Sequence, residues 1–241
     1  MDMVVFNYSK ISWITGIMTL LTTVLNNGLR ITSKENFTAK HFGSMVKKYG
    51  VTFTISSAYF SSILMTSPDF TREDFMTMKH FMIGGERIPY NLRESIKSRM
   101  NPGCFYVAYG STESALLTRT DCKADTSSVK DNIVGKLIEN AMCKIVSITS
   151  EKVLGPNQVG RVFVKTDTML SVTFNFRKKQ LKKRSFQGYY GNERLTADCL
   201  NDGWYEMGDI GYFDDKGTLY VHGRIKDIIF INGKMVLFCF G

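Results

Sequence analysis

The chain has 241 residues, and its 31 lysines and arginines against 22 aspartates and glutamates give a net charge of +9. A hydrophobic fraction of 44%, with 12% aromatic residues, excludes a disordered or low-complexity chain. The length allows one large domain or two small ones. The positive charge raises nucleic acid or an anionic membrane as a partner, so its position along the chain has to be found.

Cysteine and histidine residues are scattered along the chain. The five cysteines stand far apart and never form a C-x-x-C pair, so the sequence indicates neither a disulfide framework nor a zinc site. None of the three histidines has the spacing of a metal-binding motif. We therefore expect a protein of a reducing compartment.

The stretch between Lys10 and Arg30 carries no charge, which could indicate a membrane span. One helical stripe is apolar and comprises Ile14, Ile17, Met18, Leu21 and Leu25, whereas another is polar and comprises Thr15, Thr19, Thr22 and Asn26. Because a membrane helix would be apolar all round, the pattern predicts a half-buried helix of a soluble protein. No transmembrane span is expected, and the first residues do not resemble a signal peptide.

Strands and helices alternate through the first half of the chain. In chain order the patterns predict a strand at 3–6, a helix at 12–27, a strand at 29–32, a helix at 38–49, a strand at 51–56, a helix at 59–65, a strand at 79–83, a helix at 91–99 and a strand at 104–108. Repeated units of this length predict an α/β fold with a doubly wound, mostly parallel sheet.

The second half has little helical periodicity. Strands are predicted at 141–149, 160–166 and 217–222, separated by turn residues. We expect an α/β subdomain over 1–135, followed by a smaller, β-rich subdomain resembling a distorted barrel over 136–223.

A basic run lies within 172–186, where six lysines and arginines occur in eight residues without an acid. Without these six, the net charge would be 9 − 6 = +3. Such a run is typical of a solvated loop. Nucleic-acid binding through the run remains a less favoured alternative, and no nucleic-acid partner is expected.

Two loops follow predicted strands of the parallel sheet, where ligands of such sheets bind. Gly84-Gly85-Glu86 follows the strand at 79–83, and paired glycines let a flat ligand approach the backbone. The alternative is an ordinary turn with Pro89 near the start of the next helix.

The second loop, Tyr109-Gly110-Ser111-Thr112-Glu113, follows the strand at 104–108. Its tyrosine can stack on a base, its hydroxyls can donate to a phosphate, and its carboxylate can hold magnesium. The alternative is a helix N-terminus capped by Ser111 or Thr112, which could also bind phosphate.

Two further segments lie near the end of the chain, Gly203 to Ile210 and Gly223 to Asp227. A carboxylate after a glycine, as at Asp209, can accept hydrogen bonds from both ribose hydroxyls. An arginine such as Arg224 can neutralise a phosphate. The alternatives are a hairpin and a surface ion pair.

Together, in this order and spacing, the four segments resemble the adenylate-forming superfamily of AMP-dependent synthetases and ligases, which includes acyl-CoA synthetases, 4-coumarate–CoA ligases and firefly luciferases. The aromatic-G-x-T-E motif of the family stands at 109–113, its G-W-x-x-x-G-D motif at 203–209 and its G-R-x-K-D motif at 223–227. The glycine pair at 84–85 also matches. The resemblance runs from about residue 3 to 233, as an internal fragment of the family's large N-terminal domain.

The resemblance implies a two-step reaction. ATP and a fatty or aromatic carboxylic acid give an acyl-adenylate and pyrophosphate, and the acyl group then passes to coenzyme A. It also implies that Tyr109 stacks on adenine with Gly84, Gly85 and Glu86 beside it. Oligomeric state is not implied.

The remaining roles follow from the same motif matches. Thr112 is expected to bind the α-phosphate, Glu113 to hold Mg²⁺, Asp209 to bind the ribose hydroxyls, and Arg224 to hold ribose and phosphate. Lys226 matches the hinge of the family's C-terminal domain, so 224–241 is expected to contain the hinge and a truncated start of that domain.

On the acid side, Gly110 and Ser111 are expected to border both the nucleotide and the acyl pocket. Trp13 and Gly16 lie where the family has acyl-pocket residues.

Two parts of the family pattern do not occur in this sequence. One is the Ser/Thr/Gly-rich phosphate loop, and the other is the C-terminal domain with the adenylating lysine; the family's I-K-x-x-G segment reads Ile229-Phe230-Ile231-Asn232-Gly233. Segments 172–186 and 234–241 also lack a counterpart, and our hypothesis is that they arise from translated intron or a truncated gene model.

We therefore expect a ligase fragment that is weakly active or inactive alone, with a non-catalytic nucleotide- or acyl-binding pseudoenzyme as the alternative. The family implies a cytoplasmic or peroxisomal protein, although the chain does not end in a peroxisomal tripeptide.

Overall fold

A computed structural model describes residues 3–100, 103–120, 132–166, 188–231 and 234–237. The chain forms two compact units: residues 1–108 with 120–131, and residues 109–119 with 132–241. The basic run within 172–186 lies outside the described residues. The predicted subdomain boundaries after 135 and after 223 stay predictions.

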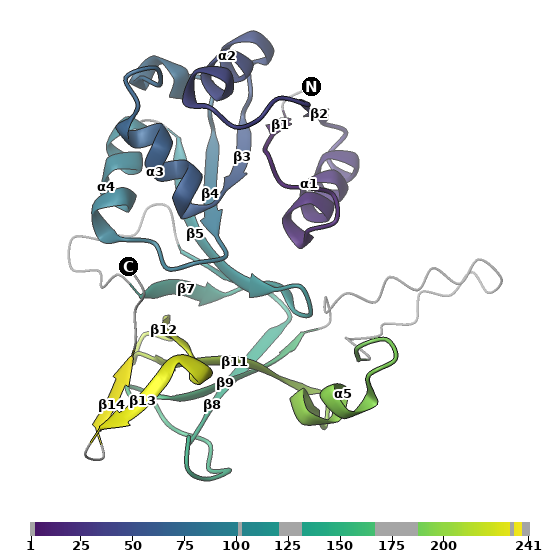
Figure 1. Cartoon of the computed structure of the whole chain (residues 1–241), viewed down its shortest axis with the longest axis vertical. Helices are drawn as coiled ribbons and strands as arrows, with labels where there is room; N and C mark the ends of the chain where they lie inside the picture. The colour runs from purple at the N-terminus through teal and green to yellow at the C-terminus, as the bar shows by residue number, and fades with distance from the viewer. Residues whose placement is uncertain (1–2, 101–102, 121–131, 167–187, 232–233, 238–241) are drawn as a thin grey trace, which may run out of the picture. The chain divides into compact units, whose positions relative to one another are not determined.

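The first unit contains a parallel sheet, whose strands are coloured from purple to teal in Figure 1. Its strands lie in the order β2-β1-β3-β4-β5. They are β1 (Val4–Phe6), β2 (Leu29–Ile31), β3 (Phe53–Ser56), β4 (His80–Gly84) and β5 (Cys104–Ser111), of which β5 belongs to this unit as far as Ala108. The predicted α/β fold with a parallel sheet is confirmed.

One helix lies in each connection between these strands: α1 (Ile14–Leu25), α2 (Ala39–Tyr49), α3 (Ala58–Thr66) and α4 (Tyr90–Arg99), with a short 3₁₀ helix, η1 (Arg72–Phe75), after α3. The local sequence sets their ends. The Thr38 hydroxyl accepts the His41 N–H at the start of α2, and Gly50 ends that helix in the left-handed conformation. Ser57 caps α3, which stops just before Ser67 and Pro68.

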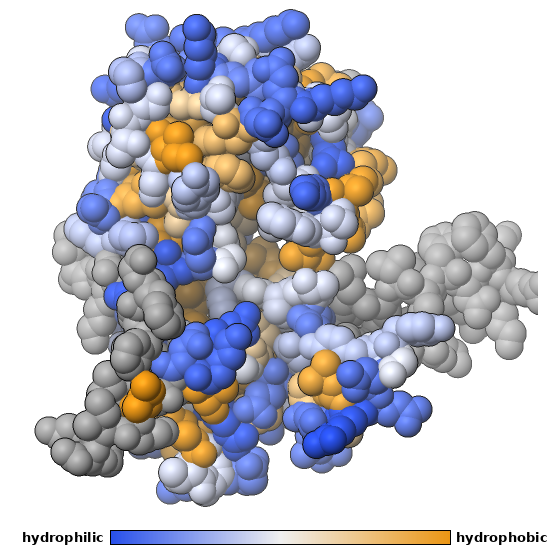
Figure 2. All heavy atoms as spheres, in the orientation of Figure 1, coloured by the Kyte–Doolittle hydropathy of each residue, from blue (hydrophilic) through white to orange (hydrophobic). Residues whose placement is uncertain are grey.

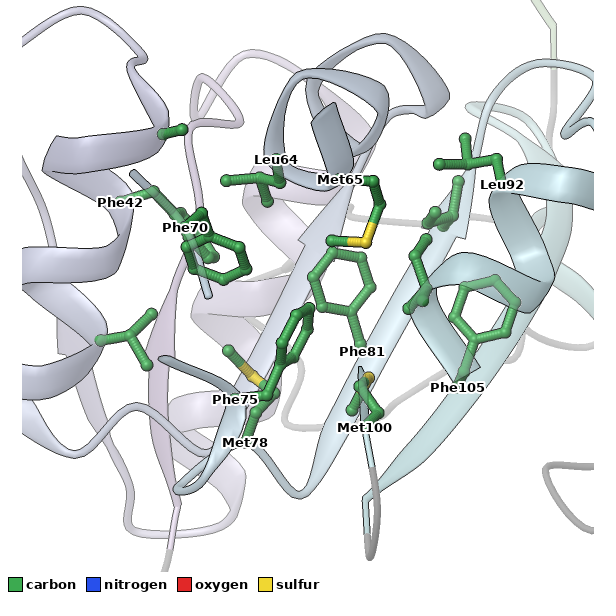
Figure 3. Packing of buried hydrophobic residues seen from close by; sticks show 14 of the residues in the cluster. Phe42, Leu64, Met65, Phe70, Phe75, Met78, Phe81, Leu92, Met100 and Phe105 are labelled. Atoms are coloured by element: carbon green, nitrogen blue, oxygen red, sulfur yellow. The ribbon is translucent and has the colours of Figure 1, made fainter. Parts of the chain in front are cut away.

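Phenylalanine rings pack among aliphatic and methionine side chains in the core of the first unit (Figure 3). Phe81 on β4 is fully buried, and its ring centroid lies 5.9 Å from that of Phe75 and 6.5 Å from that of Phe105 on β5. Phe42 of α2 contacts Phe70 at 5.6 Å between ring centroids. This packing attaches the helices to the sheet and thereby fixes the strand ends where the loops emerge.

Helix α1 forms as predicted, but its apolar stripe is not its buried face. Its buried residues are Gly16, Thr19 and Thr23, whereas Leu21 and Leu25 are 45% and 83% exposed. Hydrophobic residues accordingly reach the surface near α1 (Figure 2). At the start of the buried face the packing is close, because a Cβ at Gly16 would lie 2.0 Å from the carbonyl oxygen of Lys10.

The two buried threonines of α1 satisfy their hydroxyls by donating to carbonyls one turn earlier, Thr19 to Thr15 and Thr23 to Thr19. They therefore enter the interior without an unpaired polar atom. Among the helices of the described residues, none is long and apolar enough to cross a membrane.

The second unit is an antiparallel, β-rich part, as predicted (lower part of Figure 1). Its main strands lie in the order β6-β7-β12-β11-β9-β8, and β10 pairs with β11. The strands are β6 (Ala115–Arg119), β7 (Ile133–Leu137), β8 (Ala141–Val146), β9 (Gly160–Thr166), β10 (Leu200–Asn201), β11 (Trp204–Phe213) and β12 (Leu219–Arg224). The core includes Leu117, Ile145, Val162, Val164 and Leu219.

Three smaller elements complete the second unit. Helix α5 (Glu193–Cys199) precedes β10, and the 3₁₀ helix η2 (Ile225–Asp227) follows β12. A hairpin of β13 (Ile228–Ile231) and β14 (Lys234–Leu237) comes after η2.

We predict that removing the central aromatic ring of the first unit strongly destabilises the chain. Phe81→Ala leaves a cavity in a fully buried position and should lower the free energy of unfolding by about 3–5 kcal/mol. Urea unfolding measures this loss. Met76→Ala, at a side chain that is 69% exposed, should stay within about 0.5 kcal/mol of the wild type. Equal effects of the two substitutions would contradict the packing described here.

Candidate nucleotide site

Three side chains from the predicted motifs meet in the second unit. The Tyr109 hydroxyl, from the end of β5, donates to Asp209 Oδ2 at 2.6 Å. Arg224 Nε lies 3.3 Å from Asp209 Oδ1, and Arg224 Nη1 donates to the Met207 carbonyl at 2.9 Å. Because Asp209 and Arg224 are direct partners in the register of β11 and β12, the sheet itself brings these two motifs together.

Burial controls the charge state of this cluster. Burial raises the pKa of Asp209 above its ordinary value of 3.8, and the hydrogen bond from Tyr109 and the charge of Arg224 only partly offset it. Burial, and then the neighbouring Asp209 charge, also raise the pKa of Tyr109 well above 10, so its hydroxyl is a donor at neutral pH. Arg224, whose side chain is 54% exposed, extends the cluster to solvent.

Glu113 lies in the turn between β5 and β6 and accepts a hydrogen bond from Tyr189. The Tyr189 hydroxyl donates to Glu113 Oε1 at 2.6 Å, and it lies 3.4 Å from the Tyr205 hydroxyl. Burial raises the pKa of Glu113, but hydrogen bonds from Tyr189, the backbone, Ser111 and Tyr205 outweigh it, so the pKa lies below 4.5. Glu113 is therefore a carboxylate at neutral pH.

A half-buried, ionised carboxylate of this kind fits magnesium. Mg²⁺ is usually held by one or two carboxylates together with waters and substrate phosphates. A carboxylate has about four acceptor positions, so Glu113 keeps room for a cation beside its hydrogen bonds. In the part of the chain that the structure describes, no group of three or more His, Cys, Asp or Glu side chains could hold a metal ion.

The segment after β5 is a hairpin turn, so the alternative of a helix capped by Ser111 or Thr112 is wrong. Strand β5 continues to Ser111, and β6 begins at Ala115. The Ser111 N–H donates to Ser114 Oγ at 3.0 Å, which closes the turn. A Cβ at Gly110 would lie 1.9 Å from the Ala115 carbonyl oxygen, so the hairpin requires glycine there. Thr112 is left exposed at the tip.

For the two later motifs the alternatives were a hairpin and a surface ion pair. The structure contains a hairpin and an ion pair at these motifs, and neither conflicts with the motif geometry. Gly203 lies in the turn of the β10–β11 hairpin, with a φ of 75°. Arg224 forms the ion pair with Asp209, of which only the arginine is exposed. Lys226 is exposed in η2, two residues beyond Arg224.

Gly84, Gly85 and Glu86 belong to the first unit. Gly84 ends β4 opposite Ala108 on β5, and a Cβ there would lie 2.7 Å from the Ala108 carbonyl oxygen. The Glu86 carboxylate accepts the N–H groups of Ala58 at 2.8 Å and Tyr59 at 3.3 Å, which satisfies the start of α3. Glu86 therefore has a capping contact that its position in a glycine loop did not predict.

The two residues predicted for the acid side also lie in the first unit. Trp13 precedes α1 and is 60% exposed, whereas Gly16 is buried in the first turn of that helix. Sequence reasoning missed two polar neighbours of this region, Asn7 and Tyr8, directly after β1. Asn7 Oδ1 and Tyr8 Oη are buried atoms without a hydrogen-bond partner among the described residues.

These missed residues follow β1, where the strand order reverses between β1 and β3. Open α/β sheets bind ligands at such a reversal. The available signal was their polarity directly after a buried strand. Tyr189 and Tyr205 were also missed as partners of Glu113, although Tyr205 lies within the G-W-x-x-x-G-D motif.

Comparison with known proteins identifies the class to which this fold and these motifs belong. The model of the AMP-binding enzyme family matches residues 1–172. The fold and the motif residues are those of an adenylate-forming protein, in the part that corresponds to the large N-terminal domain. The chain belongs to the AMP-binding enzyme family, whose members include ATP-dependent acid–thiol ligases.

Individual relatives agree with this family. Over 212 residues the chain is 28% identical to luciferin 4-monooxygenase of Photuris pensylvanica, covering 87% of this chain and 35% of that protein. Over 217 residues it is 24% identical to the mitochondrial medium-chain acyl-CoA ligase ACSF2 of Rattus norvegicus, covering 90% and 33%. The chain thus spans about a third of the length of these curated relatives.

A solved structure supports the fold. The crystal structure of ATP-bound MatB from Rhodopseudomonas palustris superposes with a TM-score of 0.81 at 20% identity, covering 98% of this chain and 43% of that chain. At this identity the likeness concerns the fold alone.

The raised pKa of Asp209 predicts a specific pH dependence of stability. Between the unfolded pKa, about 3.8, and the higher folded pKa, the folded state binds more protons than the unfolded state. Stability due to Asp209 is therefore lost as the pH rises through this window. Because Asn does not titrate, Asp209→Asn should gain stability relative to the wild type from about pH 4 upward.

Urea unfolding of both proteins across this range measures the difference. Asp202→Asn, at an exposed turn residue, is the control and should not reproduce the trend. If Asp209→Asn instead lost stability relative to the wild type as the pH rises, the pKa of Asp209 would be lowered in the folded protein.

Proposed function

We propose that this chain carries the nucleotide-binding side of an ATP-dependent carboxylic acid–CoA ligase. In that reaction ATP and an acid form an acyl-adenylate and pyrophosphate, and coenzyme A then takes the acyl group. The observation that carries the proposal is the buried Asp209 carboxylate, held between Tyr109 and Arg224. Family membership supports the proposal, because the family match includes Tyr109. Asp209 and Arg224 lie beyond the matched residues, in segments that resemble two further motifs of the family.

Asp209 would bind the ribose. Its two oxygens accept from Tyr109 and Arg224 and still have acceptor capacity for the two ribose hydroxyls. The Tyr109 ring would lie against adenine. The adenine-side role of Gly84, Gly85 and Glu86, in the first unit, stays a prediction. Arg224, with its exposed guanidinium, would contact ribose and phosphate.

Thr112 and Glu113 would serve the phosphates. Thr112 is exposed at the tip of the hairpin, where its hydroxyl can donate to the α-phosphate. Magnesium, when bound at Glu113, would neutralise phosphate charge. Adenylation is attack by a carboxylate on phosphorus, so these residues would act mainly by positioning and by charge compensation. Lys226 would act as a hinge rather than as a contact.

The acid would be fatty or aromatic. The relatives are named as a medium-chain acyl-CoA ligase and a luciferin monooxygenase, which supports a largely apolar acid. In the second unit, Gly110 and Ser111 are the residues proposed to border the acid. The acyl-side role of Trp13 and Gly16, in the first unit, stays a prediction.

A second candidate function is nucleotide or acyl binding without turnover. It is favoured by the cluster itself, because Tyr109, Asp209 and Arg224 offer a hydrogen-bonding and charged surface that can bind a nucleotide whether or not bond formation follows. Catalysis would in addition need contacts that form only in the transition state, each of which typically contributes several kcal/mol.

Calorimetric titration with MgATP and pyrophosphate exchange with a panel of fatty and aromatic acids separate the two candidates. We expect measurable ATP binding with weak or no exchange. Asp209→Ala should weaken ATP binding by about 10- to 100-fold, because hydrogen bonds to a charged group contribute about 1.5–3 kcal/mol.

The matched control is Asp198→Ala, at an exposed residue of α5 in the same unit, which should bind ATP as the wild type does. Unchanged binding by Asp209→Ala would refute the proposed site. Exchange at the rate of a complete ligase would refute the expectation of weak activity and exclude the non-catalytic candidate.

A further inference from the structure

Glu113 is held by two tyrosines from distant parts of the second unit. Tyr189 lies 76 residues further along the chain and donates directly to Oε1 at 2.6 Å. Tyr205, on β11, lies with its hydroxyl 3.4 Å from that of Tyr189. The two phenols and the carboxylate thus form one continuous polar chain that links the β5–β6 turn, the turn before α5, and strand β11.

The turn that carries Tyr189 is itself fixed. The Tyr189 N–H donates to Thr196 Oγ1 at 2.9 Å, and its carbonyl accepts the Asn192 N–H at 3.1 Å. Gly188 has a φ of 133°, and a Cβ there would lie 2.4 Å from the Thr196 side chain. Only glycine therefore allows the backbone to approach α5 closely enough for this arrangement.

Tyr205 provides a rigid support. It is 6% exposed, and it pairs with Val164 on β9 and with Leu200 on β10. Strand pairing fixes its backbone, and a buried side chain in a close-packed interior has little rotamer freedom, so the Tyr205 hydroxyl keeps its position beside Tyr189.

A glutamate in a turn would otherwise sample many rotamers, and ordering it on binding would reduce affinity. A neutral phenol that occupies one carboxylate oxygen restricts these rotamers without cancelling the negative charge. Hydrogen-bond partners of metal-binding carboxylates act in this way, and their loss typically costs 10- to 100-fold in metal affinity.

We propose that Tyr189 and Tyr205 form a tyrosine clamp that positions the Glu113 carboxylate for the magnesium ion of the bound nucleotide. This role rests on the function proposed above, in which Glu113 holds that ion. The two tyrosines are positioning residues, since they act through Glu113 and do not touch the cation.

Calorimetric titration of ATP, in EDTA and in MgCl₂, tests the clamp through binding rather than turnover. The wild type should bind ATP more tightly in magnesium. Magnesium should thus produce a gain in ATP affinity. Tyr189→Phe, which removes only the hydroxyl, should reduce this magnesium-dependent gain in ATP affinity about tenfold and leave metal-free ATP binding unchanged. Tyr205→Phe should reduce this gain in ATP affinity less, because among the hydrogen-bond donors that lower the pKa of Glu113 the Tyr205 hydroxyl contributes least. Tyr190→Phe, at the fully exposed neighbouring tyrosine, should have no effect.

Thermal unfolding of each variant distinguishes a positioning role from a purely structural one. A purely structural role would lower the melting temperature and weaken ATP binding in EDTA and in MgCl₂ alike. A magnesium-dependent gain that Tyr189→Phe leaves unchanged or increases overturns the clamp, while the proposed nucleotide site stands. A wild type that binds no ATP in either buffer contradicts the proposed function and the clamp with it. If Tyr189→Phe does not fold, the effect of Tyr205→Phe on the magnesium-dependent gain decides the question.

Discussion

The buried Asp209 carboxylate is the constraint on which the second unit and its candidate site depend. Taking a carboxylate out of water costs several kcal/mol unless partners compensate its charge. Here one compensating group is Arg224 on the adjacent strand and the other is Tyr109, 100 residues earlier in the chain. Removing either partner would leave an insufficiently compensated charge, so the three side chains stabilise one another. The same unmet acceptor capacity makes Asp209 suited to bind a pair of hydroxyls.

The site combines two ways of holding a carboxylate. Asp209 is positioned by strand register, because it lies opposite Arg224 in the β11–β12 ladder. Glu113 lies in a turn, where no ladder can fix it, and its position depends on hydroxyl donors from elsewhere in the unit. Burial raises the pKa of Asp209, whereas hydrogen bonds lower that of Glu113. The pKa values of two carboxylates in one unit are thus shifted in opposite directions.

Most elements could be predicted from sequence because their ends are encoded locally. Thr38 and Gly50 delimit α2, and Ser57 and Pro68 do the same for α3, within a few residues of each helix. The face that α1 buries could not be predicted in this way. Periodicity locates an apolar stripe, but the face that is buried depends on contacts with other parts of the unit, such as the hydrogen bond from the Asn7 amide to the Thr19 hydroxyl, which is a tertiary property.

The motif residues of the candidate site could be found because each motif is contiguous, whereas their contacts could not. Ser111 and Thr112 have the composition of a helix cap, yet they form a hairpin because Gly110 lets the chain return against Ala115. The bonds from Tyr109 to Asp209 and from Tyr189 to Glu113 join residues 100 and 76 positions apart. No local pattern encodes such pairs.

A crystal structure of the chain with ATP and Mg²⁺ would show directly whether Asp209 binds the ribose. We expect the ribose hydroxyls within hydrogen-bonding distance of the Asp209 carboxylate, with the phosphates beside Thr112 and Glu113. A nucleotide bound away from Asp209, with the Tyr109–Asp209–Arg224 cluster unoccupied, would contradict this expectation.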